Sequence, residues 1–242
     1  MQPQQPAGGG VWLTGGVPMI QSIGMDAYPR IYHALIDAYG EPTWRHPLPP
    51  VDELVSTILS QNTNDTNRDV AFERLRACFG SWEAVRDAET AEIVEAIRPA
   101  GLANQKAPRI QQALREITEK TGEISLDFLA EMSVDEAKSW LTGLRGVGPK
   151  TAAIVLLFSL GRPAFPVDTH VHRVTARLGL IPAAMTAEKA HDRLEEIVPS
   201  DQYYAFHLTV IEHGRRVCVA RNPRCDSCCL QRLCAYYQQA GR

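Results

Sequence analysis

Two polar residues have the type and setting that covalent chemistry at a sugar or carbonyl carbon requires. The first, Lys150, directly follows the turn GVGP and opens an apolar segment that runs to Leu160. A cation is unfavourable in the first turn of a helix, so a lysine at this position needs a chemical reason. Neutral lysine amines are nucleophiles that form Schiff bases, which makes Lys150 a candidate nucleophile. The alternative interpretation is a lysine that contacts a phosphate or water.

Asp168 is the candidate partner of this lysine. It lies 18 residues further along the chain, at the start of the segment DTHVHRV. An aspartate at such a position commonly caps the N-terminus of a helix. Capping does not prevent the carboxylate from facing a cleft, where it can stabilise positive charge that develops during a reaction. The structural and the catalytic interpretations of Asp168 therefore both stay open.

Four cysteines near the C-terminal end have the spacing of a metal centre. They follow the pattern C-x6-C-x2-C-x5-C, at Cys218, Cys225, Cys228 and Cys234. Turn-forming residues separate them, so the four thiolates can close around one centre. Such a donor set suits Zn²⁺ or an iron–sulfur cluster, and the spacing alone decides for neither. Cys229 adjoins one of these cysteines, whereas Cys78 is expected to be buried on a helix.

The residues before Lys150 form a turn that could bind an anion. Gly146 and Gly148 lack a Cβ, so backbone amides there can approach a ligand closely. Pro149 suits the first position of the following helix, whose free amides attract phosphate. With the preceding segment DEAKSWLTGL, the turn predicts a helix–hairpin–helix unit. The alternative is a glycine-rich turn without a chemical role.

The elements that must position these residues are all predicted to be helical. Apolar residues recur at helical spacing through most of the chain, and no segment has a convincing period of two. Start and stop signals support this interpretation: Pro50 begins one helix, Gly80 ends another, and Ser133 with Glu136 forms a capping box. The sequence therefore predicts an all-α fold.

Composition is ordinary for a globular chain of 242 residues, with 45% apolar and 22% charged residues. No apolar run approaches the ~20 residues that span a bilayer. Residues 1–24 are expected to be a flexible tail, because their beginning is rich in Gln, Pro and Gly and lacks the features of a secretory signal. We therefore expect a cytoplasmic protein without structural disulfides.

The charge distribution is uneven along the chain. A net charge of −3 argues mildly against a nucleic-acid partner, since such domains are usually basic. The last 32 residues, however, contain six arginines and only two acidic residues. A local basic patch can bind phosphates on an acidic protein. The alternative for this segment is a solvated surface.

The motifs LRGVGPKTA and VDTHVHRV and the four-cysteine spacing, in this order, resemble the endonuclease III family of DNA glycosylases within the helix–hairpin–helix superfamily. The resemblance extends from about Asp52 to Tyr237 and includes GLANQKA. It implies a monomeric two-lobed enzyme with a DNA cleft between the lobes and a [4Fe–4S] cluster at the four cysteines, with Zn²⁺ as the alternative. The implied units are a helical barrel domain over 50–163 and a discontinuous cluster domain over 25–49 and 164–242.

The resemblance also implies a reaction. The family flips a damaged base out of duplex DNA, because the glycosidic carbon is not reachable inside the stack. Lys150 matches the nucleophile that attacks C1′ and forms a Schiff base, after which β-elimination cuts the strand. Asp168 matches the essential carboxylate. The implied function is a bifunctional glycosylase and abasic-site lyase for oxidised pyrimidines, acting on the bacterial nucleoid.

The expected DNA-contacting residues fall in several matched motifs. Gly146 and Gly148 belong to the hairpin, Leu102 matches a wedge residue, and His170 and Arg173 lie in the matched VDTHVHRV. A buried leucine is the alternative for Leu102, and a structural histidine is the alternative for His170.

The stretch ILSQNTND departs from the family's LLSAQATD. The glutamine that fills the gap left by the flipped base would fall on Asn62, unless Gln61 takes that role. A QNT sequence also occurs in relatives that act on alkylated purines. Two further interpretations therefore stay open: the same fold acting on alkylated purines, mismatched bases or bare abasic sites, and a DNA-binding protein without catalysis.

Overall fold

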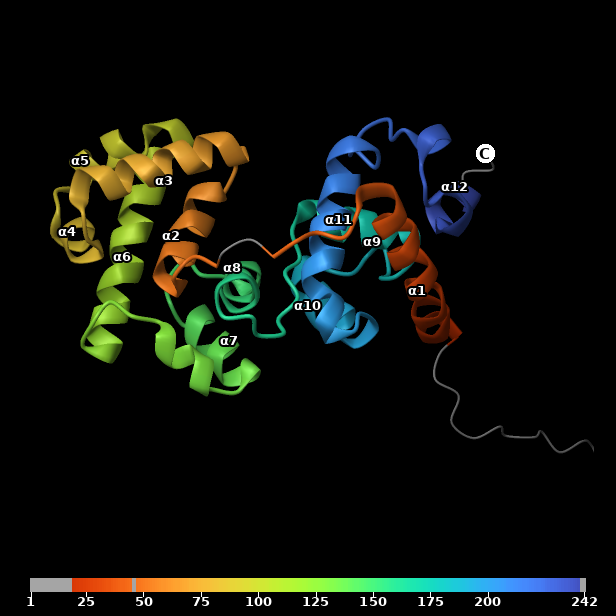
Figure 1. The fold of residues 1–242 in the computed structure, drawn as a ribbon, viewed down its shortest axis with the longest axis horizontal. Helices are drawn as coiled ribbons and strands as arrows, with labels where there is room; N and C mark the ends of the chain where they lie inside the picture. The colour runs from red at the N-terminus through yellow and green to blue at the C-terminus, as the bar shows by residue number, and fades with distance from the viewer. Residues whose placement is uncertain (1–18, 45–46, 240–242) are drawn as a thin grey trace, which may run out of the picture.

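The computed structural model describes residues 19–44 and 47–239, with side chains from residue 26 onward. All regular elements in these ranges are helices, which confirms the all-α prediction (Figure 1). They form two lobes that lie side by side along the long axis of the molecule. Within the described residues, no helix is both long enough and apolar enough to cross a membrane.

The first lobe contains the helices of the middle of the chain. A 3-10 turn at Arg98–Ala100 precedes its longest helix, and a second 3-10 turn lies at Asp127–Glu131. Its α-helices are α2 (Pro50–Ser60), α3 (Asp65–Phe79), α4 (Trp82–Asp87), α5 (Thr90–Ala96), α6 (Ala103–Thr121), α7 (Val134–Thr142) and α8 (Pro149–Ile154).

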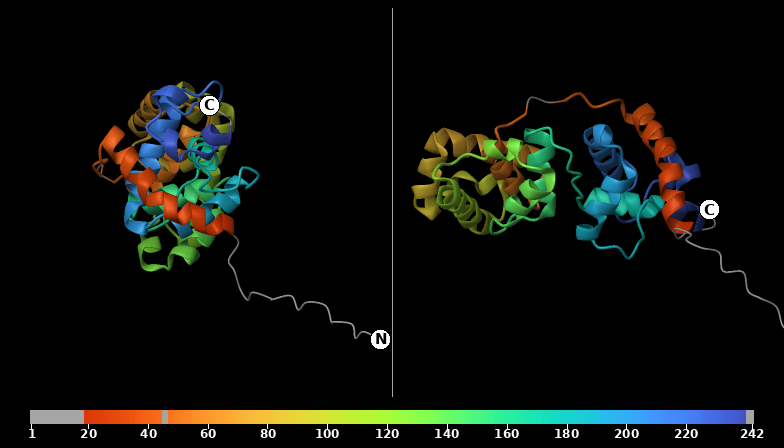
Figure 2. Two further views of the ribbon diagram at one scale, coloured as in Figure 1. Left: turned by 90° about the vertical axis from the view of Figure 1, so that its right-hand side faces the viewer. Right: turned by 90° about the horizontal axis from the view of Figure 1, so that it is seen from below.

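The second lobe combines the two ends of the described chain. Its first helix, α1, packs beside α11, although the first lobe lies between them in the sequence (Figure 2). Three-residue 3-10 turns punctuate the remainder of this lobe, at Ser200–Gln202, Cys225–Ser227 and Gln231–Leu233. Its α-helices are α1 (Met19–Tyr39), α9 (Thr169–Leu178), α10 (Ala187–Ile197), α11 (Tyr203–Arg216) and α12 (Ala235–Gln239).

The expected tail over residues 1–24 falls partly on described residues. Helix α1 begins at Met19, so residues 19–24 are helical where a tail is expected. Residues 1–18 lie outside the described residues.

Each lobe has its own hydrophobic core. The first core is formed mainly by the helices from α2 through α8. The second is formed by α1 together with the elements from residue 157 onward. The cores meet in the π-helical turn Val155–Ser159, where Leu156 belongs to the first and Leu157 to the second. Two ion pairs also bridge the lobes, Lys138–Glu195 at 2.6 Å and Arg215–Asp65 at 2.8 Å. The domain limits at 50–163 stay a prediction.

Helix ends agree with the sequence signals. Ser133 and Glu136 form both hydrogen bonds of the capping box of α7. Gly80 ends α3 with a φ of +71°, which glycine adopts without strain. The prediction for Cys78 was wrong, because this cysteine is exposed. Cys78 lies three residues after Leu75, in the last turn of α3 and on the face that carries Ala71 and Leu75. The core covers this face at Ala71 and Leu75 but does not cover Cys78.

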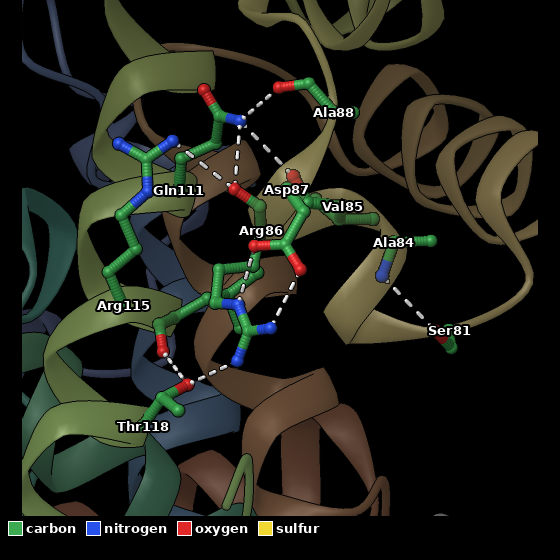
Figure 3. Close-up of polar contacts among 10 residues, drawn as sticks. Ser81, Ala84, Val85, Arg86, Asp87, Ala88, Gln111, Arg115 and Thr118 are labelled. Carbon is green, nitrogen blue, oxygen red and sulfur yellow. Dashed lines mark hydrogen bonds and ion pairs between the residues drawn. The ribbon is translucent and has the colours of Figure 1, made fainter.

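A buried polar contact fixes α6 against α4 (Figure 3). The side-chain amide of Gln111 is 1% exposed and donates to the carbonyl oxygens of Val85, Arg86 and Ala88, at 3.2, 3.2 and 2.8 Å. These carbonyls lie at the end of α4, where helical partners are missing. Arg86 in turn donates to Thr118 Oγ1 at 3.1 Å. Helix α6 is therefore a rigid support for the loops at its N-terminal end.

Candidate active site

A groove of about 1400 Å³ receives residues from both lobes. Its walls include residues of α2, the loop that leads from α2 into the first turn of α3, the loop before α6, and parts of α8, α9 and α11. Lys150 comes from the first lobe and Asp168 from the second, and both line this groove. The structure therefore brings the two candidate catalytic residues to one site.

Lys150 is placed by the start of α8. Gly148 is the N-cap and Pro149 occupies the first position, as the sequence predicts. The next three residues, 151–153, are buried in the core of the first lobe, whereas Lys150 is half-buried. Ile154, one turn later, lines the groove with Lys150. The helix is thus anchored by one face and presents the lysine on the other.

Asp168 caps a helix and also lies at the groove, so its catalytic role stays a prediction. It is the N-cap of α9, and its Oδ1 accepts a hydrogen bond from the Val171 N–H at 2.7 Å. The same side chain is half-buried and lines the groove. The cap holds the carboxylate in one orientation at the groove wall, without removing it from the site.

His207 is a groove residue that the sequence interpretation missed. It is 3% exposed on α11, and its Nδ1 lies 3.0 Å from the Pro166 carbonyl oxygen. Burial lowers the pKa of His207 to about 4. The nearby Asp168 carboxylate opposes this shift, and the charge of Lys150 adds to it.

The imidazole of His207 is therefore neutral at pH 7. Its Nδ1–H donates to the carbonyl, which leaves Nε2 as an acceptor. A signal for this residue exists in the sequence. His207 interrupts the apolar stripe of α11 formed by Tyr203, Phe206 and Val210, which are all buried. A histidine inside such a stripe marks a buried ring with a specific partner.

Leu102 and Asn62 share an unusual backbone conformation. Among the non-glycine residues described, only these two and Asn222 have positive φ, with 54° at Asn62 and 50° at Leu102. Leu102 is 46% exposed, so its interpretation as a core leucine was wrong. Strained conformations of this kind concentrate at functional sites.

Both strained residues belong to segments of the groove wall. Asn62 lines the groove, as do the residues 99–101 that directly precede Leu102. Gln61 also lines the groove, and its Oε1 accepts from Arg109 Nη1 at 3.1 Å. Gln61 is thus held by a side-chain partner, whereas Asn62 is exposed.

The hairpin between α7 and α8 has the two predicted glycines. Gly146 has a φ of +85° and needs glycine for its conformation. Gly148 is extended, with a φ of −96°, so its backbone suits any residue. Both glycines are exposed, and a Cβ at either would meet no atom within 4 Å. The open hairpin is therefore accessible to a ligand.

His170 and Arg173 lie on α9 and contact each other. Arg173 Nη2 is 3.0 Å from His170 Nδ1 and donates to the Gly214 carbonyl at 2.9 Å. Arg173 Nε donates to the Cys218 carbonyl at 2.9 Å. The guanidinium therefore joins α9 to the start of the cysteine segment, and its role as a DNA contact stays a prediction. Of the pair, His170 lines the groove.

Gly214 on α11 is a second residue that the sequence interpretation missed. A Cβ at this position would lie 3.0 Å from the Cβ of His170 and 3.3 Å from Arg173 Nη2. Glycine is needed there because α9 and α11 approach closely, which brings Asp168 and His207 to the same wall.

The four predicted cysteines line one small cavity. Val174 and Leu178 form its apolar side, and Arg177 Nη1 lies 3.3 Å from Cys218 Sγ. Burial raises the pKa of Cys228 to about 11, and neighbouring thiols, including Cys234, add to the shift. Four thiols that line one apolar cavity, with the Arg177 N–H donor beside Cys218, are a donor set that suits an iron–sulfur cluster. Within 26–44 and 47–239, no group of three or more His, Cys, Asp or Glu side chains is placed so that it could hold a single metal ion.

Known proteins of similar sequence agree with this geometry. Residues 55–200 match the family model described as HhH-GPD superfamily base excision DNA repair protein. The endonuclease III of Thermotoga maritima is 35% identical over 193 residues, which is 80% of this chain and 86% of that protein. The endonuclease III of Sulfolobus acidocaldarius is 33% identical, covering 76% and 81% of the two chains.

Solved structures extend the similarity. A non-covalent endonuclease III–DNA complex has a TM-score of 0.77 at 26% identity, covering 90% of this chain and 98% of that one. A trapped covalent endonuclease III–DNA intermediate has a TM-score of 0.76 at 26% identity, covering 90% and 99%. The fold and groove thus define a helix–hairpin–helix base excision repair protein. Within that superfamily, the chain belongs to the endonuclease III family of DNA glycosylases, as the motifs indicate.

Proposed function

We propose that this protein removes oxidised pyrimidines from duplex DNA and then cuts the strand at the resulting abasic site. The observation that carries the proposal is the groove in which Lys150 of one lobe faces the same space as Asp168 of the other. The similarity to a trapped covalent protein–DNA intermediate supports a covalent mechanism.

The nucleophile is Lys150. Once Nζ has given a proton to Asp168, it attacks C1′ of the flipped nucleotide and the C1′–N bond breaks. The base leaves with the electron pair of that bond and takes up the proton that Nζ loses on bonding to C1′. Opening of the sugar ring then gives a Schiff base between Nζ and C1′. Loss of a proton from C2′ and cleavage of the C3′–O bond complete the β-elimination. Water finally hydrolyses the Schiff base and regenerates the amine.

Asp168 acts on the charge changes in these steps. Its carboxylate accepts a proton from the amine and stabilises positive charge on the sugar as the base departs. The cap at Val171 N–H fixes the carboxylate before the substrate binds. Electrostatic stabilisation is effective when such groups are oriented in advance, because no reorganisation is needed during the reaction.

DNA recognition uses the surfaces around the groove. The hairpin amides near Gly146 and Gly148 bind phosphate, and Asn62, with Gln61 beside it, enters the space left by the flipped base. Leu102 inserts into the duplex from the loop before α6, where its exposure permits this contact. Binding to phosphate positions the duplex without reading its sequence. His170 contributes to the same wall.

The cysteines Cys218, Cys225, Cys228 and Cys234 hold a [4Fe–4S] cluster in this proposal. These four cysteines would hold the cluster, which would crosslink a segment whose 3-10 turns are short and would order the arginines of the C-terminal region. A visible absorption spectrum tests the assignment, because an iron–sulfur centre is coloured and a zinc site is colourless. A colourless, zinc-loaded protein would favour the alternative metal.

Borohydride trapping on an abasic duplex tests the nucleophile. The wild-type protein is expected to form a covalent adduct, and Lys150→Ala is expected to form none. Lys189→Ala is the matched control, because Lys189 is an exposed lysine of α10 outside the groove lining. An undiminished adduct in Lys150→Ala would contradict the assignment. Absence of any adduct with the wild type would leave a DNA-binding protein.

A lesion panel tests the substrate class. Thymine glycol in a matched duplex is expected to be excised faster than 3-methyladenine. The reverse order would support a glycosylase for alkylated purines, and activity on abasic sites alone would support a lyase without base removal. A cytoplasmic, nucleoid-associated and monomeric state stays a prediction.

A further inference from the structure

Lys106 is a fully buried lysine that bridges two separate elements. It lies on α6, is 1% exposed, and donates from Nζ to the carbonyl oxygens of Leu59 at 2.7 Å and Ala100 at 2.8 Å. Leu59 is in the last turn of α2, and Ala100 ends the 3-10 turn Arg98–Ala100. Carbonyl groups at helix ends lack partners within the helix, so one amine caps both elements.

The two capped elements lead directly into the two residues with positive φ, of which Asn62 lines the groove and Leu102 directly follows the lining residues 99–101. Asn62 follows Leu59 by three residues, and Leu102 follows Ala100 by two. Both Asn62 and Leu102 have positive φ, and such conformations persist only where surrounding contacts fix them. The Lys106 amine is a contact that the two segments share.

Because Lys106 is buried, the loss of its hydrogen bonds would be energetically costly. A buried amine is tolerated only when its N–H groups are hydrogen-bonded, and removing the amine leaves two buried carbonyl oxygens without their donor. Burial also lowers the pKa of Lys106. Gln111, one turn and one residue further along α6, anchors the same helix to α4 (Figure 3).

We propose that Lys106 is a positioning residue that holds Asn62 and Leu102 at a fixed separation, so that both enter the duplex together when a base is flipped. Lys106 does not touch the substrate and acts through the backbone of the two segments. The proposal rests on the function proposed above, because it needs a base-flipping reaction on duplex DNA.

Two substrates separate this role from catalysis. Excision of thymine glycol from a duplex requires insertion of the probing residues. Cleavage of an abasic site in a single-stranded oligonucleotide requires the groove chemistry but no insertion. Lys106→Met retains the length and apolar part of the side chain and removes the N–H donors. We expect the single-turnover duplex rate to fall about 10- to 100-fold and the single-strand rate to change less than about threefold.

Ile117→Ala is the matched stability control. Ile117 is a fully buried residue of α6, three turns from Lys106 and outside the groove lining. Thermal unfolding is measured for both variants. A duplex-selective loss in Lys106→Met, without the same selectivity in Ile117→Ala, supports the proposal.

Equal losses on both substrates, or the same selectivity in Ile117→Ala, would overturn the positioning role. If Lys106→Met does not fold, Lys106→Gln is measured instead. Its shorter side chain is not expected to bridge both carbonyls, so the same criterion applies to it. A wild-type protein that is inactive on both substrates would instead refute the proposed function, so the two failures are distinguishable.

Discussion

The two lobes are stabilised by different kinds of interaction. The first lobe has a continuous apolar core formed by consecutive helices, and its buried polar side chains include Lys106 and Gln111, whose bonds go to backbone carbonyls. The second lobe is assembled from both ends of the chain and finishes in a cysteine segment of short 3-10 turns. We therefore expect hydrophobic packing to hold the first lobe, whereas the cysteine segment of the second lobe is expected to need the proposed metal centre.

The difference matters because each lobe supplies one of the candidate catalytic residues. Lys150 stands on a helix that is anchored in the first core, close to where the two cores meet. Asp168 stands at the start of α9, which packs on α11 and on the cysteine segment through Arg173. Local unfolding of the second lobe would therefore displace Asp168 from the site even when the first lobe remains folded.

The largest expected effects come from substituting the two candidate catalytic residues, one from each lobe. We expect Lys150→Ala to lower the single-turnover rate on an abasic duplex by about 10³-fold or more, because it removes the nucleophile. Asp168→Asn keeps the cap and removes the charge, and about a 100-fold loss is expected. Rates are measured by cleavage of labelled duplex. A larger loss for Asp168→Asn than for Lys150→Ala would contradict the assigned roles.

The next effect tests the dependence of the second lobe on its metal centre. Cys228→Ala is expected to lose amide protection in residues 217–239 by at least an order of magnitude, while protection in α2 and α6 stays within about threefold. Hydrogen exchange measures both lobes in one experiment. Cys229→Ala is the matched control, because it removes the neighbouring, exposed cysteine. Equal loss of protection in both lobes would show that their stabilities are not separable.

Acid is expected to destabilise the second lobe first. Among the described residues, the three buried histidines, His191, His207 and His213, all belong to that lobe, and burial lowers the pKa of each. An unfolded chain binds protons at the ordinary histidine pKa of about 6.5, whereas folded His207 stays neutral down to about pH 4.

The stabilisation from neutral His207 is complete above about pH 6.5 and is lost as the pH falls towards 4, by up to about 3 kcal/mol. Urea unfolding at several pH values, followed by hydrogen exchange, measures the loss and assigns it to a lobe. His207→Gln is expected to flatten this dependence. A dependence that is unchanged in His207→Gln would assign the effect to other groups.

The smallest effect concerns a local feature of the first lobe. Ser133→Ala removes the capping box of α7, and we expect the free energy of unfolding to fall by about 1 kcal/mol. The cap is exposed and lies away from the groove, so the rate of strand cleavage is expected to stay within twofold of wild type. Urea unfolding and cleavage assays check the two statements. A marked rate loss would show that α7 influences the hairpin.

Much of the helical framework could be predicted from local signals. Proline at the start of α8, the capping box of α7 and the glycine after α3 each act through the backbone of a few neighbouring residues. The cysteine spacing is equally local, because short loops cannot separate the four thiols widely. Such features depend on chain geometry over one or two turns, which the sequence determines directly.

Residues whose roles depend on contacts between distant parts of the chain could not be predicted from local sequence signals. The roles of His207 and Gly214 depend on the close approach of α9 to α11. The role of Lys106 depends on hydrogen bonds to two carbonyl oxygens, which lie 47 and 6 residues away in the sequence. Cys78 was predicted to be buried, but neighbouring elements decide how far the core extends along α3, and it does not cover the last turn at Cys78.

The sequence by itself determined the helices, their caps and the types of residue available for chemistry, since these follow from interactions within a few residues. Only the tertiary structure decided that Lys150 and Asp168 share one groove and that Leu102 is exposed. Those outcomes depend on how two cores pack against each other, and packing is a property of surfaces that the chain brings together from far apart.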